Sequence, residues 1–433
     1  MHSTDSRQRP AGQAGQAAGQ LPRLLPAGSG TGPAGLSEHL ARYGPLGSAG
    51  LSRPRREALL DKVDRSGLTG RGGAGFPAAR KLAAVAAGHN PVVVGNGTEG
   101  EPASCKDKVL LSRSPHLVLD GAVLAAELAG ASQAVIVVHH SVREIVDAAA
   151  AERTQAGADR VRIRVMTAAD RFVAGEASAV VHWIEDGVPA PTRKPPRISE
   201  RGLGGRPTLL HNVETLAHLA LIGRYGASWF RAVGTPAEPG SMLVTILGAA
   251  NQPCVCEIAI GTSVQETLSL AGGAAGPPQA LLLGGYYGSW VDAAAAETVP
   301  FSSEGLAVLG AGAGAGLIAA LPQDACGLAE TARVVRYLAD ESARQCGPCL
   351  FGLDAIAGEL QRVAEGRTSD LSLLRRWLGQ VDGRGACSHP DGAAGLVRSA
   401  LDVFKPELGQ HARGWCGGTR TANVLPVPPR RQP

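Results

Sequence analysis

The segment Gly67–Lys81, GLTGRGGAGFPAARK, decides the fold because it joins a glycine-rich loop directly to a helix-forming stretch that carries a lysine. Without a Cβ, the backbone of such a loop can adopt positive φ and turn several N–H groups toward one point. Arg71 and Lys81 add positive charge, and backbone N–H groups before a helix bind anions. The loop glycines at issue are Gly70, Gly72, Gly73 and Gly75. Taken by itself, the run fits a phosphate-binding loop and a plain turn equally well.

Composition narrows the function classes. A chain of 433 residues with 44% hydrophobic residues predicts two to four domains with real cores. The net charge of +4, without a basic stripe, disfavours nucleic-acid binding. Eight cysteines without a secretory signal favour a reducing compartment, and we expect a cytoplasmic protein.

Strands alternate with helices after the glycine loop. PVVVGNGTEGEP, from Pro91, reads as a buried strand that ends in a polar loop, and AVIVVHH and VRIRV are two further strands. Helical spacing lies between them, so we predict a covered, mostly parallel α/β sheet with ligands at its carboxyl edge. A later segment, HNVETL from His211, opens a helix that Asn212 can cap, a role that the residue pattern by itself favours over ligand binding.

The rest of the chain divides into further parts. We expect disorder over 1–50, the α/β domain over 51–240, a compact α+β unit over 241–325, helices over 326–412 and a loose tail over 413–433. The glycine-loaded stretch Gly305–Leu321 is short for a membrane span, and we interpret it as a strand and glycine turn leading into a buried helix.

The cysteines of the helical part suggest a redox site. Cys346 and Cys349 form a C-x-x-C pair, and Cys387 follows between two predicted helices. This pattern resembles thiolate ligation of an iron–sulfur cluster more than a zinc site, because no second pair completes a tetrahedron. A redox dithiol is the alternative.

Taken together, these segments resemble the flavoprotein subunit of respiratory complex I, the NADH-dehydrogenase F or 51-kilodalton family, with relatives in bidirectional hydrogenases and formate dehydrogenases. The likeness runs from about Gly67 to Glu407. The motifs that carry it are GLTGRGGAGFP, Asn96–Pro102 as N-x-x-E-x-E-P, CKDK at Cys105, A-G-E at Ala174–Glu176, KPP at Lys194, HNVETL at His211 and C-G-P-C at Cys346.

The resemblance implies an FMN site, a soluble-ligand-binding β-grasp domain over 241–325 and a helical bundle with a [4Fe–4S] cluster. The FMN contacts that it implies are Gly70, Arg71, Gly72, Lys81, Asn96, Glu99, Asn212 and Thr215. The nucleotide contacts that it implies are Phe76, Glu101, Phe172, Gly175, Glu176, Lys194 and Arg197. Glu99 and Glu176 would orient the pyridine nucleotide.

The chain departs from the family pattern at the cluster. The first cysteine of that motif falls on Ala343, which leaves Cys346, Cys349 and Cys387 as ligands. A [3Fe–4S] cluster, a cluster with a borrowed ligand or no cluster at all would each fit. The candidates for a borrowed ligand are Cys326, Cys416 and His389, although we interpret His389 as a surface residue.

The nucleotide pocket departs as well. Phe76 keeps one aromatic partner for the adenine, whereas Ala84 and Arg197 stand where the family has others. Each lost stacking partner would cost about 0.5–1.5 kcal/mol of NADH binding. Arg197 could instead meet a ribose phosphate, which would favour NADPH.

These features predict an FMN-dependent oxidoreductase that passes electrons from NAD(P)H to an iron–sulfur cluster or a partner carrier. The alternatives are a flavin and iron–sulfur electron relay that no longer oxidises NADH, and a non-catalytic scaffold. We expect a ferredoxin-like or other iron–sulfur partner, or the subunits of a redox complex, with no direct membrane span and a location in the cytoplasm or at the periphery of a membrane complex.

Overall fold

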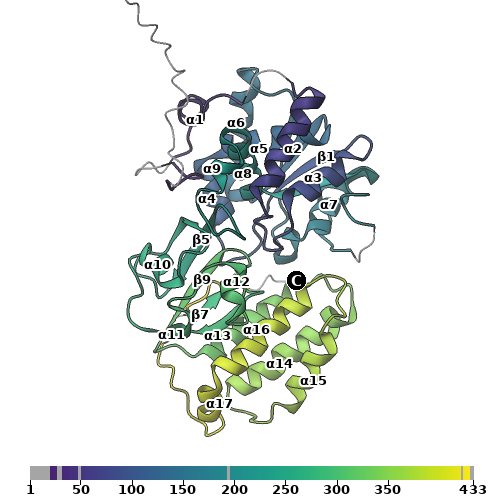
Figure 1. The fold of residues 1–433 in the computed structure, drawn as a ribbon. Coiled ribbons are helices and arrows are strands. Elements are labelled where there is room, and N and C mark those ends of the chain that lie inside the picture. Colours follow the sequence, from purple (N-terminus) through teal and green to yellow (C-terminus); the bar gives the residue numbers. More distant parts are fainter. Residues whose placement is uncertain (1–19, 27–31, 47–49, 193–195, 421–422, 430–433) are drawn as a thin grey trace, which may run out of the picture.

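A computed structural model describes residues 20–26, 32–46, 50–192, 196–420 and 423–429. An α/β part forms the upper half of Figure 1, and a second sheet and a helical region lie side by side below it. The molecule therefore has three parts of different type, in the order that the sequence predicts.

The first sheet is wholly parallel, with the strand order β3-β2-β1-β4. Its strands are β1 (Val92–Gly97), β2 (Gln133–Val138), β3 (Arg162–Thr167) and β4 (Thr208–Asn212). β1 lies between β2 and β4, so the polar ends of β1 and β4 meet at one edge, where Asn96 is in register with Asn212. The predicted parallel α/β sheet is confirmed.

Helices cover both faces of this sheet. Alternate strand residues such as Val93 and Ile136 point into a large core with α5 and α8, whereas Val94 and Val135 point toward α7. The helices of this part are α1 (Leu36–Tyr43), α2 (Arg53–Ser66), α3 (Ala78–Ala86), α4 (Lys106–Arg113), α5 (Pro115–Ala129), α6 (Arg143–Gln155), α7 (Ala177–Asp186), α8 (Val213–Tyr225) and α9 (Ala227–Phe230), with short 3-10 turns at His140–Val142, Phe172–Gly175 and Leu203–Gly205.

The second sheet is mixed, with the order β6-β5-β9-β7-β8, and only β5 and β9 are parallel. Its strands are β5 (Ser241–Gly248), β6 (Cys254–Ala259), β7 (Pro278–Leu283), β8 (Ser289–Asp292) and β9 (Leu317–Pro322), and its helices are α10 (Val264–Ser269), α11 (Ala293–Ala296) and α12 (Ser303–Ala307).

The stretch Gly305–Leu321 has the reverse order of the one predicted. It begins at the end of helix α12, passes through a glycine turn and ends in the buried strand β9. β9 is the central strand of the second sheet, and both of its faces are covered by core residues. A strand buried on both faces has the same continuous apolar run as a buried helix, so the pattern alone did not separate them.

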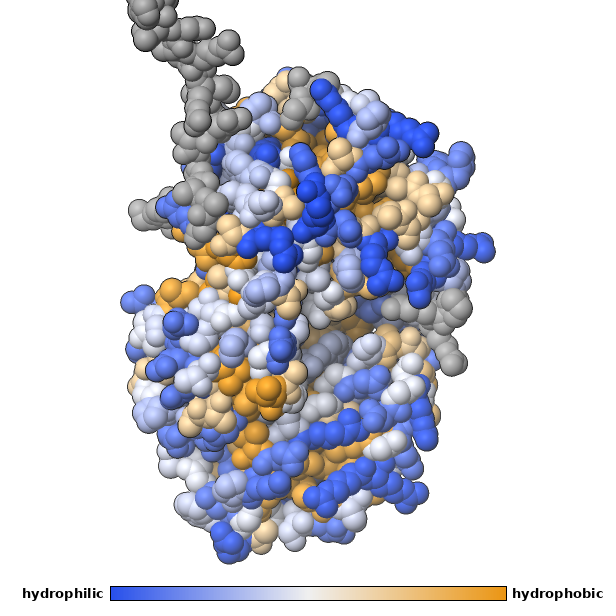
Figure 2. All heavy atoms as spheres, viewed as in Figure 1, coloured by the Kyte–Doolittle hydropathy of each residue, from blue (hydrophilic) through white to orange (hydrophobic). Residues whose placement is uncertain are grey.

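The C-terminal region is helical, as predicted. It contains α13 (Gly327–Asp340), a π-helical turn (Pro348–Gly352), α14 (Leu353–Ala364), α15 (Ser372–Val381), α16 (His389–Val403) and α17 (Lys405–His411). Hydrophilic side chains form bands over this region with hydrophobic ones between them (Figure 2), which is typical of amphipathic helices that pack into a bundle.

The expected disorder over 1–50 is wrong for the described part of that segment. Arg23 is fully buried, its guanidinium stacks on the ring of Trp229 at 3.9 Å, and its backbone N–H donates to Glu257 Oε2 at 2.7 Å. Helix α1 contributes His39, which pairs with Asp120 at 2.7 Å. The composition of the segment could not predict this ordered packing, because the contacts are made by isolated charged residues. Residues 1–19, 27–31 and 47–49 of this segment lie outside the described residues.

The expected loose tail over 413–433 is wrong in its described part as well. The backbone N–H groups of Thr419 and Arg420 both donate to Asp324 O at 2.9 Å. Leu425 is buried, and its N–H donates to Glu330 Oε2 at 3.0 Å. The segment therefore packs along the start of α13, although its proline and glycine content is typical of a loose end.

Within the described residues, no single helix is long and apolar enough to cross a membrane. Helices α4 and α5 reach that length and composition only as a pair, and they are bent by 96° at the break between them.

Candidate functional site

The glycine loop lies against the start of helix α8. The N–H of Arg71 donates to Thr215 Oγ1 at 2.9 Å, and a Cβ built on Gly72 would lie 3.4 Å from the Cβ of Asn212. Gly73 has a φ of +95°, a conformation that side chains rarely adopt. The loop residues from Gly72 to Pro77 are exposed. The loop is thus a bare backbone surface beside a helix N-terminus, the arrangement that binds phosphate.

Two asparagines complete this edge of the sheet. Asn212 caps α8, because its Oδ1 accepts from the N–H of Glu214 at 3.0 Å, and its Nδ2 donates to Asn96 O at 3.2 Å. Asn96 Nδ2 in turn donates to Gly175 O at 3.0 Å. The structure therefore brings together the predicted residues Asn96, Gly175, Asn212 and Thr215 with the glycine loop. The interpretation of Asn212 as a helix cap is confirmed, and it does not compete with a place at the site.

A lysine and a histidine lie behind the loop. Lys81 Nζ donates to Leu210 O at 2.5 Å. His211 follows Leu210 and is 4% exposed, and its Nε2 has no hydrogen-bond partner among the described residues. Burial and the charge of Lys81 lower the pKa of His211 to about 3, so the imidazole is neutral at pH 7. The sequence pattern did not single out His211 as a site residue. The feature that could have identified it is its position directly before Asn212 at the end of a strand.

An FMN phosphate fits this set of groups. It needs backbone N–H donors, a cation and a close approach without side chains, which the glycine loop, Lys81 and the α8 N-terminus provide. An orphaned buried ring nitrogen, such as that of His211, is rare in a protein and is explained when a ligand or water satisfies it.

The two glutamates expected to contact cofactors are engaged as helix caps. Glu99 has a positive φ of 44°, and its carboxylate accepts from the N–H groups of Asp107 and Lys108 at 3.0 and 2.9 Å. Glu176 caps α7 by accepting from the N–H groups of Ser178 and Ala179 at 2.7 and 3.0 Å. Both side chains therefore hold the loops in place, Glu99 through both of its carboxylate oxygens and Glu176 through Oε2.

Phe172 and Glu101 lie deeper than expected. The Phe172 ring is 8% exposed and packs edge-on against Tyr287 and Tyr337, at centroid distances of 5.0 and 6.0 Å. Glu101 Oε2 accepts from the N–H of Tyr286 at 3.1 Å, and burial raises the pKa of Glu101 to about 8. These side chains join the α/β part to the second sheet and the helices, and Phe172 also lines the cavity between the α/β part and helix α13.

The remaining predicted nucleotide residues are on the surface or outside the described residues. Phe76 is 47% exposed on the glycine loop, with the Arg80 guanidinium 5.7 Å from its ring centroid. Arg197 is exposed as well. Lys194 lies outside the described residues.

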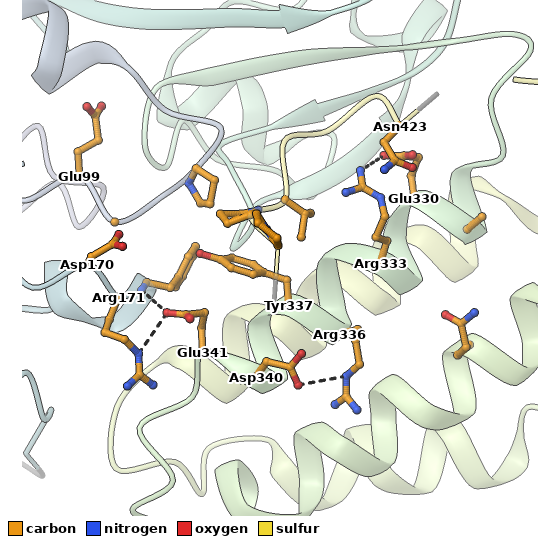
Figure 3. A pocket seen from close by; sticks show the side chains of 18 of the residues that line it. Glu99, Asp170, Arg171, Glu330, Arg333, Arg336, Tyr337, Asp340, Glu341 and Asn423 are labelled. Atoms are coloured by element: carbon orange, nitrogen blue, oxygen red, sulfur yellow. Dashed lines mark hydrogen bonds and ion pairs between the residues drawn. The ribbon is translucent and has the colours of Figure 1, made fainter. Parts of the chain in front are cut away.

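A cavity of about 1170 Å³ separates the α/β part from the helical region. Its walls are the loop that carries Glu99, the segment around Arg171, helix α13 and the C-terminal segment (Figure 3). Ion pairs line it, among them Arg171 with Glu341 at 3.3 Å and Arg333 with Glu330 at 2.7 Å. The cavity is large enough for a dinucleotide. The sequence motifs did not predict it.

The three predicted cluster cysteines lie in one region of the fold, but their sulfurs do not all lie within 4.8 Å of one another. Cys349 lies on the π-helical turn, and burial together with the nearby Cys346 and Cys387 thiols raises the pKa of Cys349 to about 12. Burial also raises the pKa of Cys387, and the Glu176 carboxylate is among the charges that act on it. Cys349 and Cys346 pack in one hydrophobic cluster with Phe172, which follows the carboxyl end of β3.

The proposed substitutes for the missing ligand lie elsewhere or are engaged. His389 is buried, not on the surface; its Nε2 bonds Leu338 O at 2.7 Å and its Nδ1 bonds the Tyr287 hydroxyl. Both ring nitrogens are therefore occupied. Cys326 and Cys416 group with His411, within 4.8 Å of one another.

Comparisons with known proteins match this arrangement. Residues 63–221 match the Nuo51 FMN-binding domain, and residues 329–411 match the iron–sulfur binding region of NADH-ubiquinone oxidoreductase F. The first of two F subunits of the NADH-quinone oxidoreductase of Rhizobium meliloti (strain 1021) is 30% identical over 374 residues, which cover 82% of this chain and 86% of that protein. The F subunit of the Rickettsia felis enzyme is 29% identical over 381 residues, which cover 83% and 90%.

A solved structure agrees. The crystal structure of an NAD+-reducing [NiFe]-hydrogenase in the H2-reduced state superposes with a TM-score of 0.77 at 30% identity, over 82% of this chain. This chain spans 63% of the matched hydrogenase chain, so it corresponds to a part of it. The relatives, the two matched regions and the fold lead to one conclusion: the chain belongs to the 51-kilodalton (NuoF) family of NADH-quinone oxidoreductases.

Proposed function

We propose that this chain is an FMN-dependent oxidoreductase component that takes electrons from NAD(P)H and passes them to an iron–sulfur cluster and a partner carrier. The observation that carries the proposal is the meeting of the glycine loop, Lys81 and the α8 N-terminus at one sheet edge. Cys346 and Cys349, which pack in one cluster with Phe172, support it. When bound, FMN supplies the change from two-electron to one-electron transfer.

The chain's own residues would hold and orient the reactants. Gly72 would present its exposed backbone to the phosphate, and Lys81 would supply the charge. Arg71 would fix the loop through its N–H bond to Thr215, and Asn96 and Asn212 would hold the strand ends beside it. Glu99 and Glu176 would act indirectly, because their carboxylates cap helices α4 and α7 and so hold the loops beside the site. Cys346, Cys349 and Cys387 are the proposed cluster ligands, which leaves one iron corner without a protein thiolate.

We further propose the domain limits 51–240 for the FMN- and nucleotide-binding domain, 241–325 for a soluble-ligand-binding β-grasp domain and 326–412 for the iron–sulfur domain. A mixed five-stranded sheet with the helix α10 supports the β-grasp assignment. The physiological setting that we propose is a redox assembly of several chains, in which a ferredoxin-like iron–sulfur protein receives the electrons.

An electron relay that no longer oxidises NADH is the second candidate. It is favoured by the environments of the nucleotide residues: Phe172 is buried, the carboxylates of Glu99 and Glu176 are engaged, and Ala84 and Arg197 replace aromatic partners of the adenine. Under this proposal the flavin would be reduced by a protein partner.

Anaerobic visible spectra before and after addition of NADH, then NADPH, distinguish the two candidates. Bleaching of a bound flavin by either nucleotide is expected for the oxidoreductase, and the preferred nucleotide shows how Arg197 acts. A flavin that both nucleotides leave oxidised, but that a reduced iron–sulfur protein bleaches, would replace the first proposal with the relay. A colourless protein that takes up no added FMN would contradict both.

The proposed phosphate site makes a separate prediction for Lys81→Met. Removal of a charged hydrogen-bond donor to the phosphate should weaken FMN binding about 10- to 100-fold. The dissociation constant is measured from the quenching of FMN fluorescence by flavin-free protein. Lys62→Met, which changes an exposed lysine on the preceding helix α2, should leave that constant unchanged. Equal FMN affinity for the Lys81 variant and the parent would remove Lys81 from the site.

A further inference from the structure

A second cluster of cysteine and histidine side chains is formed by residues that flank the three cysteines described above in the sequence. Cys326, His411 and Cys416 each direct one donor atom to a common point, and these atoms lie within 4.8 Å of one another. The Cys326 sulfur is 3.6 Å from His411 Nε2. In a tetrahedral zinc site, metal–sulfur bonds of about 2.3 Å and metal–nitrogen bonds of about 2.0 Å place sulfur and nitrogen roughly 3.6 Å apart. The side chains already have the spacing of metal ligands.

Polar groups on two sides hold the Cys326 sulfur in place. Cys326 is the N-cap of α13, a helix of 14 residues, and its sulfur accepts from the N–H of Ala329 at 3.3 Å. Glu407 closes the other side, with its Oε2 3.4 Å from the sulfur and also accepting from the N–H of Leu328 at 3.0 Å.

His411 is the buried member of the cluster. It is 4% exposed, and its Nδ1 has no hydrogen-bond partner among the described residues. A buried imidazole that contacts only a sulfur through its other nitrogen is poorly satisfied, since neutral nitrogen and thiol groups bond weakly. A metal ion bound at Nε2, between the imidazole and the two sulfurs, would replace this weak contact with a strong one and would leave Nδ1 as it is.

The backbone also approaches the cluster closely. A Cβ built on Gly418 would lie 2.9 Å from the Cβ of Cys326, so only glycine lets the segment pass at this distance. Beyond it, Thr419 and Arg420 bond to Asp324, two residues before Cys326. The C-terminal segment is thus held against the start of α13 directly beside the three ligands.

We propose that Cys326, His411 and Cys416 form a binding site for one divalent, thiolate-preferring transition-metal ion such as Zn²⁺, which fastens the C-terminal segment to the start of helix α13. Two thiolates and an imidazole are a typical zinc ligand set, and water can complete the tetrahedron on the exposed side of Cys416. This site is distinct from the iron–sulfur ligands and has no part in the proposed electron transfer.

The test measures zinc in the full-length protein, purified with reductant and offered ZnCl₂ before gel filtration. About one zinc ion per chain is expected in the parent. Cys416→Ser should reduce the zinc content at least about tenfold, because it removes one of the two thiolate ligands. Since Cys416 is exposed, the substitution should not disturb folding. The matched variant Cys254→Ser, which changes a half-buried cysteine on β6, should keep the full amount.

X-ray absorption at the zinc edge separates this site from adventitious binding. Two sulfur ligands and one nitrogen are expected, whereas zinc at Cys346, Cys349 and Cys387 would give three sulfurs and would persist in Cys416→Ser. That result, or a parent that takes up no zinc, would overturn the proposal. A Cys326–Cys416 disulfide that forms in air, with no zinc uptake after its reduction, would overturn it too.

Discussion

Replacing Lys106 with methionine is expected to destabilise the α/β part of the protein by about 3–5 kcal/mol, because it leaves buried carboxylates without their cation. Lys106 is 4% exposed, and its Nζ donates to Asp107 Oδ1 at 2.7 Å and to Glu214 Oε2 at 2.9 Å. Glu214 Oε1 also accepts from the N–H of Leu243 at 2.9 Å, so the cluster links α4, α8 and the first strand of the second sheet. The melting temperature, measured by circular dichroism, should fall by on the order of 10 °C.

The pH dependence distinguishes this cause from lost packing. Although burial opposes ionisation of Glu214, Lys106 lowers the pKa of this carboxyl group to about 2. In the parent, the ionised carboxylate therefore stabilises the fold at every pH above its ordinary pKa, and this stabilisation is lost only as the pH falls toward 2. Burial raises the pKa of Asp107 to about 6 even with Lys106 present. Without the ammonium group both values should rise, and protonation at low pH should relieve the unpaired charge. The destabilisation should therefore be smaller at pH 5 than at pH 8.

An exposed lysine provides the control for this comparison. Lys405 pairs with Asp402 at 3.3 Å, and both side chains are largely exposed. Lys405→Met should change the stability by about 1 kcal/mol or less at either pH, because water screens such pairs. An equally small effect of Lys106→Met would show that Lys106 is not needed to hold the domain together.

The sequence predicted the fold correctly where the pattern of neighbouring residues matches the surroundings of those residues in the folded protein. The glycine loop, the parallel strands with their polar ends and the C-x-x-C pair are all readable from neighbouring residues. β9 was misread as the start of a helix, because its neighbours β5 and β7, which make it a central strand, come from distant parts of the chain.

The side-chain roles were harder to predict than the fold. Glu99 and Glu176 stand in the expected motifs, yet their carboxylates cap α4 and α7, a role set by the local path of the backbone. His389 and Arg23 are polar and were assigned to the surface or to disorder, but hydrogen bonds to distant carbonyl groups allow their burial. The grouping of Cys326 with His411 joins residues that the sequence separates by most of the helical region.

Replacing Cys346 with serine is expected to abolish the iron–sulfur chromophore while FMN stays bound. Cys346, Cys349 and Cys387 are the only three thiolates that we assign to the cluster, since Ala343 replaces a fourth. Loss of one leaves two ligands, too few to hold a cubane. Cys346 is half-buried and precedes the π-helical turn, so serine fits without a cavity in the core. Iron and sulfide per chain and the visible spectrum report the loss.

Two further variants decide whether this loss is specific to the cluster. Cys416→Ser removes a thiol of the other cluster and should keep the full iron content. Ala343→Cys restores the fourth cysteine of the family motif and, if the site holds an incomplete cluster, should raise the iron content and abolish the EPR signal typical of an oxidised three-iron centre. Ala343 is half-buried, and the backbone turns at the next residue, Arg344, whose φ is +54°. A cysteine at position 343 therefore needs no change in the path of the loop. Full iron in Cys346→Ser would refute the ligand assignment, because the cluster would then be held without the Cys346 thiolate.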